Sequence, residues 1–445
     1  MFTQQNKLRI VPALLATLLA AACGSSSEPG TTPTGTTPQA AEEARSTKSY
    51  DANPHVSDAD FASFIGDNND FGFDLYRQVA PEGTSNVFLS PASVSVALAM
   101  TYAGARNQTE TQMATAMHFK LPQSALHPAF NKLSLALASR NLAIHSTDEG
   151  DKSIKLNMVN SAWAQKGYAF VPEYLDTLAV EHNAGIKLLD YIADADGSRQ
   201  TINAWVDAKT EHKITELLPD GSIDGSTRLV LTNTLYFYGS WGSAFDRALT
   251  KDAVFHAPAG DVTVPTMQAM RWIGYAEGDG WQMFELPYEG NQLGMTVILP
   301  TEGRFAEVRG ALTSDWLGTA TAQMKSFEGE VSVSLPKFRF TWGTQSLKAP
   351  LANLGMIDAF AYPAADFSGM EASKELYISN VFHKAFVGVD EDGTEAVAAT
   401  AVVMNSGATP QVPKVVDVNG PFLFMIRDAT GAILFLGQVS DPSKS

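Results

Sequence analysis

Apolar residues recur along the chain at two different spacings, which predict both helices and strands. From Phe61 to Leu75 the spacing is helical, and further helices are expected over residues 93–102, 109–117 and 202–218. Apolar stretches typical of strands cover residues 229–238, 295–299, 331–340 and 422–439, the last as a hairpin that turns at residues 428–431. Helices gather early and strands late in the chain, which indicates an α+β fold.

The first 22 residues have the pattern of an export signal. Lys7 and Arg9 precede an apolar run over residues 10–22, which is too short to span a membrane. The run ends before Cys23 and Gly24 and resembles a bacterial lipoprotein signal, with Ala20 where that signal prefers leucine. Cys23 is the only cysteine in the chain, and lipidation of its thiol would account for it. The alternative is a plain signal peptide with an incidental cysteine.

The residues after Cys23 form a predicted tether. Residues 24–40 are rich in Gly, Ser, Thr and Pro, a composition that cannot bury a core. We therefore assign residues 23–57 to the lipidated cysteine and its flexible tether, and residues 58–445 to one folded domain. This organisation predicts a protein that is held by its lipid at the bacterial cell envelope, or an extracellular protein. Gly24 directly after Cys23 favours the outer membrane as the place of the anchor.

Charge and motifs limit the possible functions. The chain has 445 residues and a formal net charge of −17, and such acidity repels nucleic acid. No basic patch indicates heparin binding. The sequence contains no Gly-x-Ser-x-Gly elbow, His-Glu-x-x-His motif or glycine-rich phosphate loop, so we predict no enzyme activity, no metal and no cofactor. The chain nevertheless has eight histidines, so its composition alone does not exclude a catalytic Ser-His-Asp triad.

Several segments resemble the serpin family in order and spacing. They are residues 86–93 (Asn-Val-Phe-Leu-Ser-Pro-Ala-Ser), 203–206 (Asn-Ala-Trp-Val), 233–241 (Asn-Thr-Leu-Tyr-Phe-Tyr-Gly-Ser-Trp), 286–288 (Leu-Pro-Tyr), 335–338 (Leu-Pro-Lys-Phe), 366–370 (Asp-Phe-Ser-Gly-Met), 383–385 (His-Lys-Ala), 393–396 (Gly-Thr-Glu-Ala) and 421–422 (Pro-Phe). The resemblance implies the serpin fold, with three β-sheets, about eight or nine helices and an exposed reactive-centre loop at about residues 391–414.

The resemblance also implies a function. Inhibitory serpins are suicide inhibitors of serine endopeptidases: the protease cleaves the loop, and the loop inserts into the main β-sheet before the acyl-enzyme is hydrolysed. We therefore expect a monomer that forms a covalent complex with a serine protease. A non-inhibitory serpin that acts as a binding or chaperone protein is the alternative.

Insertion requires a hinge of small residues, and the sequence meets this requirement. Alternate side chains of a strand face the same side, so Thr394, Ala396 and Ala398 would share one face while Glu395 lies on the other. Residues 392–409 contain no proline, which would remove a hydrogen-bond donor from the ladder. An ordinary buried strand over residues 396–404 remains the simpler interpretation. By resemblance the hinge comprises Glu391, Gly393, Thr394, Glu395, Ala396, Val397, Ala398, Ala399 and Thr400.

The family spacing also places the cleaved bond. In inhibitory serpins the cleaved residue lies sixteen positions after the hinge glutamate, here Glu391, which predicts the bond Gly407–Ala408 with a shift of one or two residues possible. Met404–Asn405 would suit a chymotrypsin-like protease but would shorten the inserted strand. Small residues around Gly407 favour an elastase- or subtilisin-like target, and no Arg or Lys lies between Glu391 and Gln411.

Two polar clusters are implied by the same resemblance. The shutter beneath the main sheet would consist of Ser90, Ser93, Asn233 and His383. The breach, where the loop enters the sheet, would consist of Trp241, Lys337 and Glu391. The simpler alternatives are a buried core histidine and a buried core tryptophan.

Overall fold

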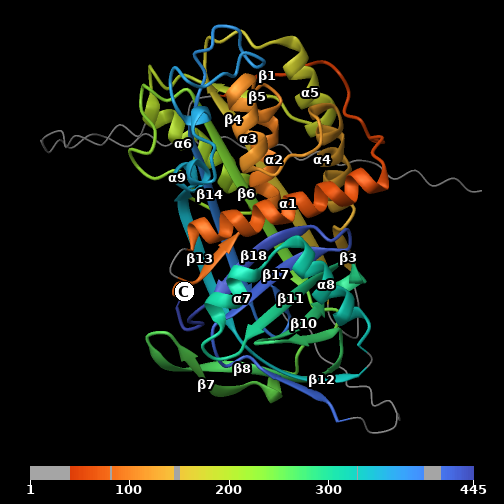
Figure 1. Cartoon of the computed structure of the whole chain (residues 1–445). Coiled ribbons are helices and arrows are strands. Elements are labelled where there is room, and N and C mark those ends of the chain that lie inside the picture. Colours follow the sequence, from red (N-terminus) through yellow and green to blue (C-terminus); the bar gives the residue numbers. More distant parts are fainter. Residues whose placement is uncertain (1–40, 81–82, 145–150, 328, 395–411, 445) are drawn as a thin grey trace, which may run out of the picture. The chain divides into compact units, whose positions relative to one another are not determined.

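The computed structural model of the chain describes residues 41–80, 83–144, 151–327, 329–394 and 412–444. Within these residues lie nine α-helices and three β-sheets (Figure 1). The predicted α+β class, with three sheets and about eight or nine helices, is confirmed. The predictions for Cys23, for hinge residues 395–400 and for Gly407 and Ala408 fall outside the described residues.

The helices lie mainly in the first half of the chain. They are α1 (Asp58–Val79), α2 (Pro91–Tyr102), α3 (Asn107–Ala116), α4 (Gln123–Ala138), α5 (Pro172–His182), α6 (Ala195–Lys209), α7 (Phe305–Ala311), α8 (Ser314–Lys325) and α9 (Lys348–Asn353), with short 3-10 turns η1 (Arg247–Leu249), η2 (Glu289–Asn291) and η3 (Asp358–Phe360).

Local signals explain two of the helix boundaries. Ser90 caps α2, because its Oγ accepts a hydrogen bond from the backbone N–H of Ser93 at 3.2 Å, and Pro91 occupies the first turn. The helix predicted over residues 202–218 instead runs from Ala195 to Lys209. Glu211 and His212 have positive φ, so the chain turns back, and the Asn203 side chain accepts hydrogen bonds from the N–H groups of residues 217 and 218. The apolar residues after 209 therefore pack on α6 without continuing it.

The main sheet has eight strands. They are β1 (Glu42–Ala44), β3 (Leu142–Ile144), β4 (Lys152–Gln165), β5 (Ile186–Leu189), β6 (Leu229–Ser240), β13 (Phe338–Ser346), β14 (Ile378–Val389) and β15 (Gly393–Thr394). Their order is β1-β5-β4-β6-β15-β14-β13, with β3 beside β4 and with a further pairing between β6 and β14. A short strand between β6 and β14 is the feature on which the functional argument rests.

Two smaller sheets complete the fold. The six-stranded sheet has the order β2 (Val87–Leu89), β18 (Ile433–Val439), β17 (Phe422–Asp428), β11 (Leu293–Pro300), β10 (Trp281–Pro287) and β9 (Tyr275–Gly278). The four-stranded sheet has the order β16 (Lys414–Asp417), β12 (Glu330–Pro336), β8 (Gly260–Trp272) and β7 (Lys251–Ala257). The predicted C-terminal hairpin is confirmed as β17 and β18.

The apolar stretch at residues 331–340 forms two strands rather than one. The chain leaves the four-stranded sheet after Pro336 and enters the main sheet at Phe338. Lys337 lies at the crossing, where its N–H donates to the Pro265 carbonyl at 2.9 Å. This change of sheet brings the Lys337 side chain to the end of the main sheet that holds β15.

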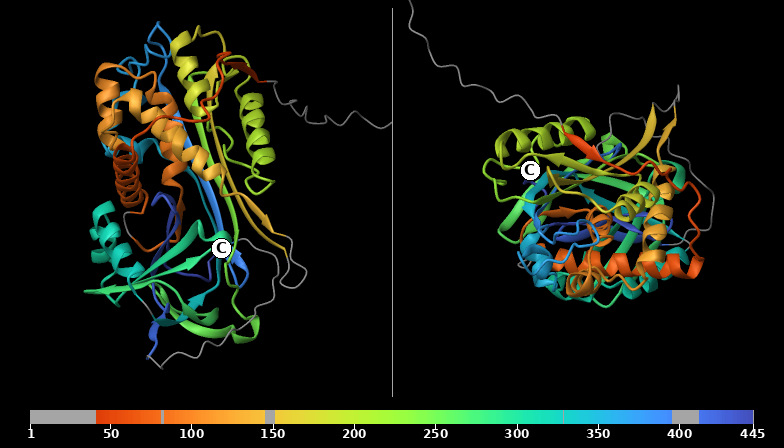
Figure 2. Two further views of the ribbon diagram at one scale, coloured as in Figure 1. Left: turned by 90° about the vertical axis from the view of Figure 1, so that its right-hand side faces the viewer. Right: turned by 90° about the horizontal axis from the view of Figure 1, so that it is seen from above.

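Helices cover both faces of the main sheet. On one face α2 lies against β4 and β6, while α6 packs on the other face with Trp163, Val230 and Phe382 (Figure 2). All twelve residues of α2 are buried, which explains why this helix has no polar face. Part of the main sheet is therefore covered by helices on both faces, while β13 and β14 also contact β2 of the six-stranded sheet.

The folded part begins earlier than the sequence predicts. Residues 41–57 were expected to belong to the tether, but Glu42–Ala44 pair with β5 at the edge of the main sheet. The Asp51 N–H also donates to the Val180 carbonyl at 2.9 Å. An unpaired strand edge exposes a row of N–H and C=O groups, and β1 satisfies those of β5. The residues after 40 thus contribute to the domain despite their polar composition.

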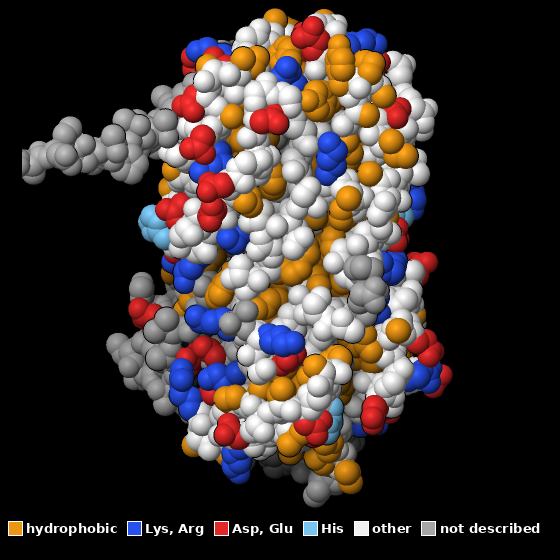
Figure 3. Space-filling view, turned by 90° about the vertical axis from the view of Figure 1, so that its left-hand side faces the viewer, with side chains coloured by type: hydrophobic (Ala, Val, Ile, Leu, Met, Phe, Trp, Pro, Cys, Tyr) orange, Lys and Arg blue, Asp and Glu red, His pale blue; other side chains and the backbone are white. Residues whose placement is uncertain are grey.

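The surface carries charges of both signs. On the face shown in Figure 3, Lys and Arg side chains lie among Asp and Glu side chains. Among the described residues no helix combines the length and the apolar character needed to cross a bilayer. The same residues contain no group of three or more His, Cys, Asp or Glu side chains suited to hold a metal ion.

A stack of aromatic rings tests the six-stranded sheet. The Phe88 ring is buried and lies parallel to the rings of Phe424 and Phe435, with centroids 5.5 and 4.7 Å away. Phe88→Ala should lower the free energy of unfolding by about 3–5 kcal/mol, because it leaves a cavity between these rings. Chemical denaturation measures the loss. Phe61→Ala, at a partly buried position on α1, is the control, and an equal loss in both variants would contradict this account.

Candidate functional site

The strands β6 and β14 pair directly along only part of their length. Their parallel pairing runs from Leu229 opposite Ile378 to Asn233 opposite His383. Beyond that point, within the described residues, β15 lies between the two strands: Gly393 pairs with Ser240, and Thr394 pairs with both Gly239 and Val389. The strands therefore form a fork that is closed at Asn233 and His383 and already holds two hinge residues at its open end.

This placement corrects one expectation about the reactive-centre loop. Residues 391–394 were expected in an exposed loop, but Glu391, Asp392 and Thr394 are at most 3% exposed, and Gly393 is also buried. Residues 395–411 lie outside the described residues, and Val412 is 93% exposed. The polar contacts of residues 390–394 with neighbouring segments account for this burial.

Only glycine fits at the first position of β15. A Cβ on Gly393 would lie 2.0 Å from the Gly239 carbonyl oxygen. The close approach lets β15 form its ladder to β6, and any side chain at position 393 would push the two strands apart. Glycine is thus required at position 393 because the backbone of β6 is so close, in addition to the flexibility that the hinge needs.

Thr394 anchors the hinge on its inner side. Its Oγ1 lies 2.6 Å from the Tyr288 hydroxyl, and the Tyr288 ring stacks on the Trp241 ring with centroids 4.7 Å apart. Burial raises the pKa of Tyr288, so its hydroxyl stays protonated. The Thr394 side chain therefore faces the closed interior of the molecule.

The structure brings the three predicted breach residues together. Lys337 Nζ lies 2.6 Å from Glu391 Oε2, and the Trp241 Nε1–H donates to the Asp390 carbonyl at 2.9 Å. Thr250 Oγ1 donates to Glu391 Oε1 at 2.8 Å. Burial by itself raises the pKa of Glu391, but the bonds from Lys337 and Thr250 bring this pKa below its usual value. Glu391 is thus a buried, ionised carboxylate.

The four predicted shutter residues also lie together, in one hydrogen-bonded network. The Asn233 Nδ2 donates to Ser93 Oγ at 2.7 Å, and His383 Nδ1 lies 2.6 Å from Asn233 Oδ1. The Ser90 N–H donates to His383 Nε2 at 3.2 Å. Because Nε2 accepts, the proton of the neutral imidazole resides on Nδ1, which donates to Asn233. The network therefore joins β6 and β14 at the closed end of the fork.

The sequence did not predict several residues that contact the shutter network or the hinge. Asn160 on β4 belongs to the shutter network, since its Oδ1 accepts from Ser93 Oγ at 2.9 Å and from Asn233 Nδ2 at 2.7 Å. Tyr288, Thr250 and Arg247 contact the hinge region. Only Tyr288 carried a signal, as the last residue of the Leu-Pro-Tyr segment at 286–288.

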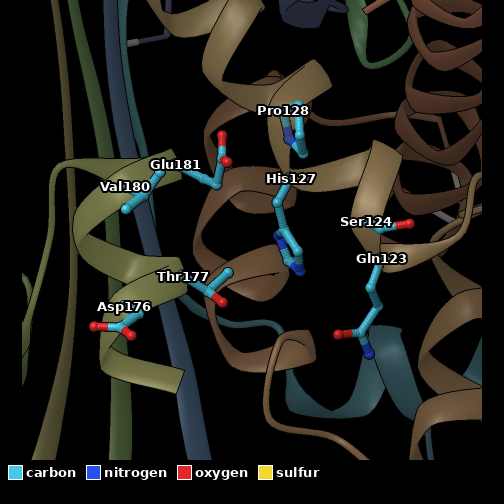
Figure 4. A pocket seen from close by; sticks show the side chains of 8 residues that line it. All are labelled: Gln123, Ser124, His127, Pro128, Asp176, Thr177, Val180 and Glu181. Atoms are coloured by element: carbon cyan, nitrogen blue, oxygen red, sulfur yellow. The ribbon is translucent and has the colours of Figure 1, made fainter. Parts of the chain in front are cut away.

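A pocket between α4 and α5 bears on the open question of a Ser-His-Asp triad. It has a volume of about 300 Å³ and is lined by Ser124, His127 and Asp176, among others (Figure 4). His127 Nδ1, however, lies 3.1 Å from His182 Nε2, and Asp176 is bonded to Ser46 and Lys48. Among the described residues no histidine has hydrogen bonds to both a serine hydroxyl and a carboxylate.

The chain matches one protein family over most of its length. Residues 66–442 match the family described as serpin (serine protease inhibitor). The chain is a serpin. It is 39% identical over 377 residues to an uncharacterized serpin-like protein of Thermococcus kodakarensis, with 84% of each chain covered. It is also 34% identical over 386 residues to the leukocyte elastase inhibitor of Homo sapiens, with 84% of this serpin and 98% of that protein covered.

Solved structures give the same result. The serpin is similar to the thermophilic serpin tengpin in its native state, with a TM-score of 0.77 and 28% identity, and the match covers 90% of this chain and 99% of that one. Thyroxine-binding globulin in complex with thyroxine is similar with a TM-score of 0.72 and 27% identity. The predicted family and fold are thereby confirmed.

The His383 imidazole makes the stability of this serpin depend on pH. Burial lowers the pKa of His383 to about 4, whereas an unfolded histidine titrates near 6.5. As the pH falls through this window the unfolded state binds the proton first, so the free energy of unfolding decreases, by roughly 2 kcal/mol at pH 5 from this group alone. His383→Gln should reduce the difference between thermal midpoints at pH 7 and pH 5. The exposed His212→Gln is the control, and the same difference in all three proteins would refute this role.

Proposed function

We propose that this serpin is an irreversible suicide inhibitor of serine endopeptidases with an elastase- or subtilisin-like target. The observation that carries the proposal is the position of β15, whose two residues lie between β6 and β14 in the register that a longer inserted strand would continue. A protease would attack the Gly407 carbonyl, form an ester through its serine and release the amine of Ala408. Insertion before hydrolysis of this ester would trap the enzyme.

The register of β15 supports this mechanism. Thr394 pairs with Gly239 on β6 and with Val389 on β14. Continued antiparallel pairing would place Thr400 between Asn233 and His383, at the closed end of the fork, and Met404 opposite Leu229, where β6 begins. Insertion would thus replace the direct pairing of β6 with β14, and it would part the two shutter residues that hydrogen-bond each other.

The same register favours Gly407–Ala408 over Met404–Asn405 as the cleaved bond. From Thr394 to Met404 an inserted strand would extend about 33 Å, at ~3.3 Å per residue, and would end level with the first residue of β6. A protease bound at residue 404 would have to fit against the end of the sheet itself. A protease bound at Gly407 would lie clear of that end.

The names of the relatives agree with an inhibitor but do not name the target. One similar protein is called leukocyte elastase inhibitor, and this name describes that protein. The small residues around Gly407 are the support for an elastase- or subtilisin-like target here. The alternative, a non-inhibitory serpin, would lack insertion after cleavage.

We also propose that the serpin is exported and anchored by its lipid. The support lies in the signal pattern before Cys23 and in the Gly/Ser/Thr/Pro-rich stretch of residues 24–40. An anchor of this kind would hold the inhibitor at the bacterial cell envelope, where it would meet secreted proteases as a monomer.

Incubation with pancreatic elastase and with subtilisin tests the proposed function. We expect an SDS-stable covalent complex with at least one of them, and mass spectrometry of the released C-terminal fragment should give a first residue at Ala408 or within two positions of it. The loop-cleaved protein should melt tens of degrees higher than the native protein. Cleavage without a complex and without this rise in thermal midpoint would favour the non-inhibitory alternative.

Thr394→Arg separates trapping from cleavage. The Thr394 side chain is 2% exposed and contacts Tyr288, so an arginine there would place a charge in a closed interior and stall insertion. The variant should be cleaved as a substrate, with at least a tenfold fall in complex formed per cleavage, measured by gel densitometry. Glu395→Arg, on the opposite face by strand alternation, is the matched control and should still trap. Equal trapping by both variants would rule out insertion past Thr394.

A further inference from the structure

An acidic triplet precedes the strand that starts insertion. Asp390, Glu391 and Asp392 lie between β14 and β15, and the last two carboxylates are only 3% and 2% exposed. Buried carboxylates are costly unless cations and hydrogen bonds compensate them. Burial and the neighbouring carboxylates raise the pKa of Asp390, which reflects this concentration of negative charge.

The backbone of the triplet is bound to the segment that follows β6. The Asp390 carbonyl accepts from the Trp241 Nε1–H at 2.9 Å, and the Asp392 carbonyl accepts from the Trp241 backbone N–H at 2.9 Å. The Glu391 carbonyl accepts from the Phe245 N–H at 2.8 Å. Each carbonyl of the triplet therefore has a partner in residues 241–245.

Two cations face the side chains of the triplet from different elements. Lys337 pairs with Glu391 at 2.6 Å. Arg247, on η1, forms an ion pair with Asp392 and lies 3.9 Å from Glu391. Arg247 itself is 56% exposed, so it reaches a buried carboxylate from the surface. With both cations in place, two of the three carboxylates are compensated.

Asp392 is the residue directly before β15, so its position determines where β15 begins. Without Arg247, Asp392 would lose this ion pair while Asp390 and Glu391 remain beside it in the chain. A buried carboxylate with less compensation gains hydration by moving toward solvent. Such a movement would withdraw Gly393 and Thr394 from the fork, since the two residues follow Asp392 directly in the chain. The ion pair of Arg247 with Asp392 thus lies directly before the two residues that occupy the open end of the fork.

We propose that Arg247 is a positioning residue for the hinge, whose ion pair with Asp392 keeps Gly393 and Thr394 seated between β6 and β14 before the loop is cleaved. The consequence of this ion pair rests on the proposed inhibitory function. If the loop inserts after cleavage, insertion would start from two residues that are already paired with β6 and β14. An unseated hinge would first have to enter the fork while the acyl-enzyme is being hydrolysed. The ion pair therefore biases the competition between trapping and release.

Hydrogen exchange of the native protein tests the seating without a protease. In Arg247→Ala, the peptide that contains Gly393 and Thr394 should exchange at least tenfold faster than in the wild type, and Arg247→Lys should restore most of the protection. Arg304→Ala, which removes a partly exposed arginine paired with Asp279 and Glu307, is the control and should leave this peptide unchanged. In the Asp392→Asn background, Arg247→Ala should add no further increase, because the two residues act as a pair.

Inhibition of the protease that forms the covalent complex gives the second measurement. Arg247→Ala should raise the number of inhibitor molecules consumed per trapped protease severalfold while the rate of loop cleavage stays unchanged. Unchanged exchange at β15 in Arg247→Ala would overturn the proposal. If the wild type traps no protease, the proposed function fails, and the exchange measurement alone still decides whether Arg247 seats the hinge.

Discussion

Two strands of the main sheet can pair with each other or with a third strand between them, but not both at the same positions. In this serpin β6 and β14 do both in succession: they pair directly up to Asn233 and His383, and they hold β15 at their other end. The remaining features follow from this arrangement. The buried network at Asn233 lies where the direct pairing ends, and the acidic triplet lies where the inserted segment starts.

The two ends of the fork are stabilised by different physical means. At the closed end, mostly buried neutral groups share hydrogen bonds, and the imidazole of His383 is kept uncharged by burial. At the open end, buried carboxylates pair with Lys337 and Arg247 at the border with solvent. Neutral networks depend on geometry, whereas partly exposed ion pairs also respond to salt. The two ends should thus differ in their sensitivity to ionic strength.

The sequence predicted the family, the fold class and the residues of the shutter and breach clusters. It could do so because these residues belong to motifs whose order along the chain is typical of the family. His383 and Asn233 are 150 positions apart, yet each lies in its own recognisable segment. Arg247 could not be predicted in this way: it is a single arginine in a turn, and its importance depends on a contact across 145 positions with Asp392. Likewise, residues 42–44 (Glu-Glu-Ala) gave no sign of joining the main sheet, because their partner is the backbone of β5.

Thr400 carries a hydroxyl six residues after Thr394 in the chain. If insertion follows the register of β15, this threonine arrives between Asn233 and His383 and belongs to the same inward face as Thr394. A hydroxyl both donates and accepts, so it can serve the imidazole Nδ1–H and the amide that are separated at that moment. When the sheet opens, the imidazole and the amide would then exchange one hydrogen-bond partner for another, and neither would be left without a partner. The network would therefore slow the opening of the sheet more than it would change the free-energy difference between the closed and the open sheet.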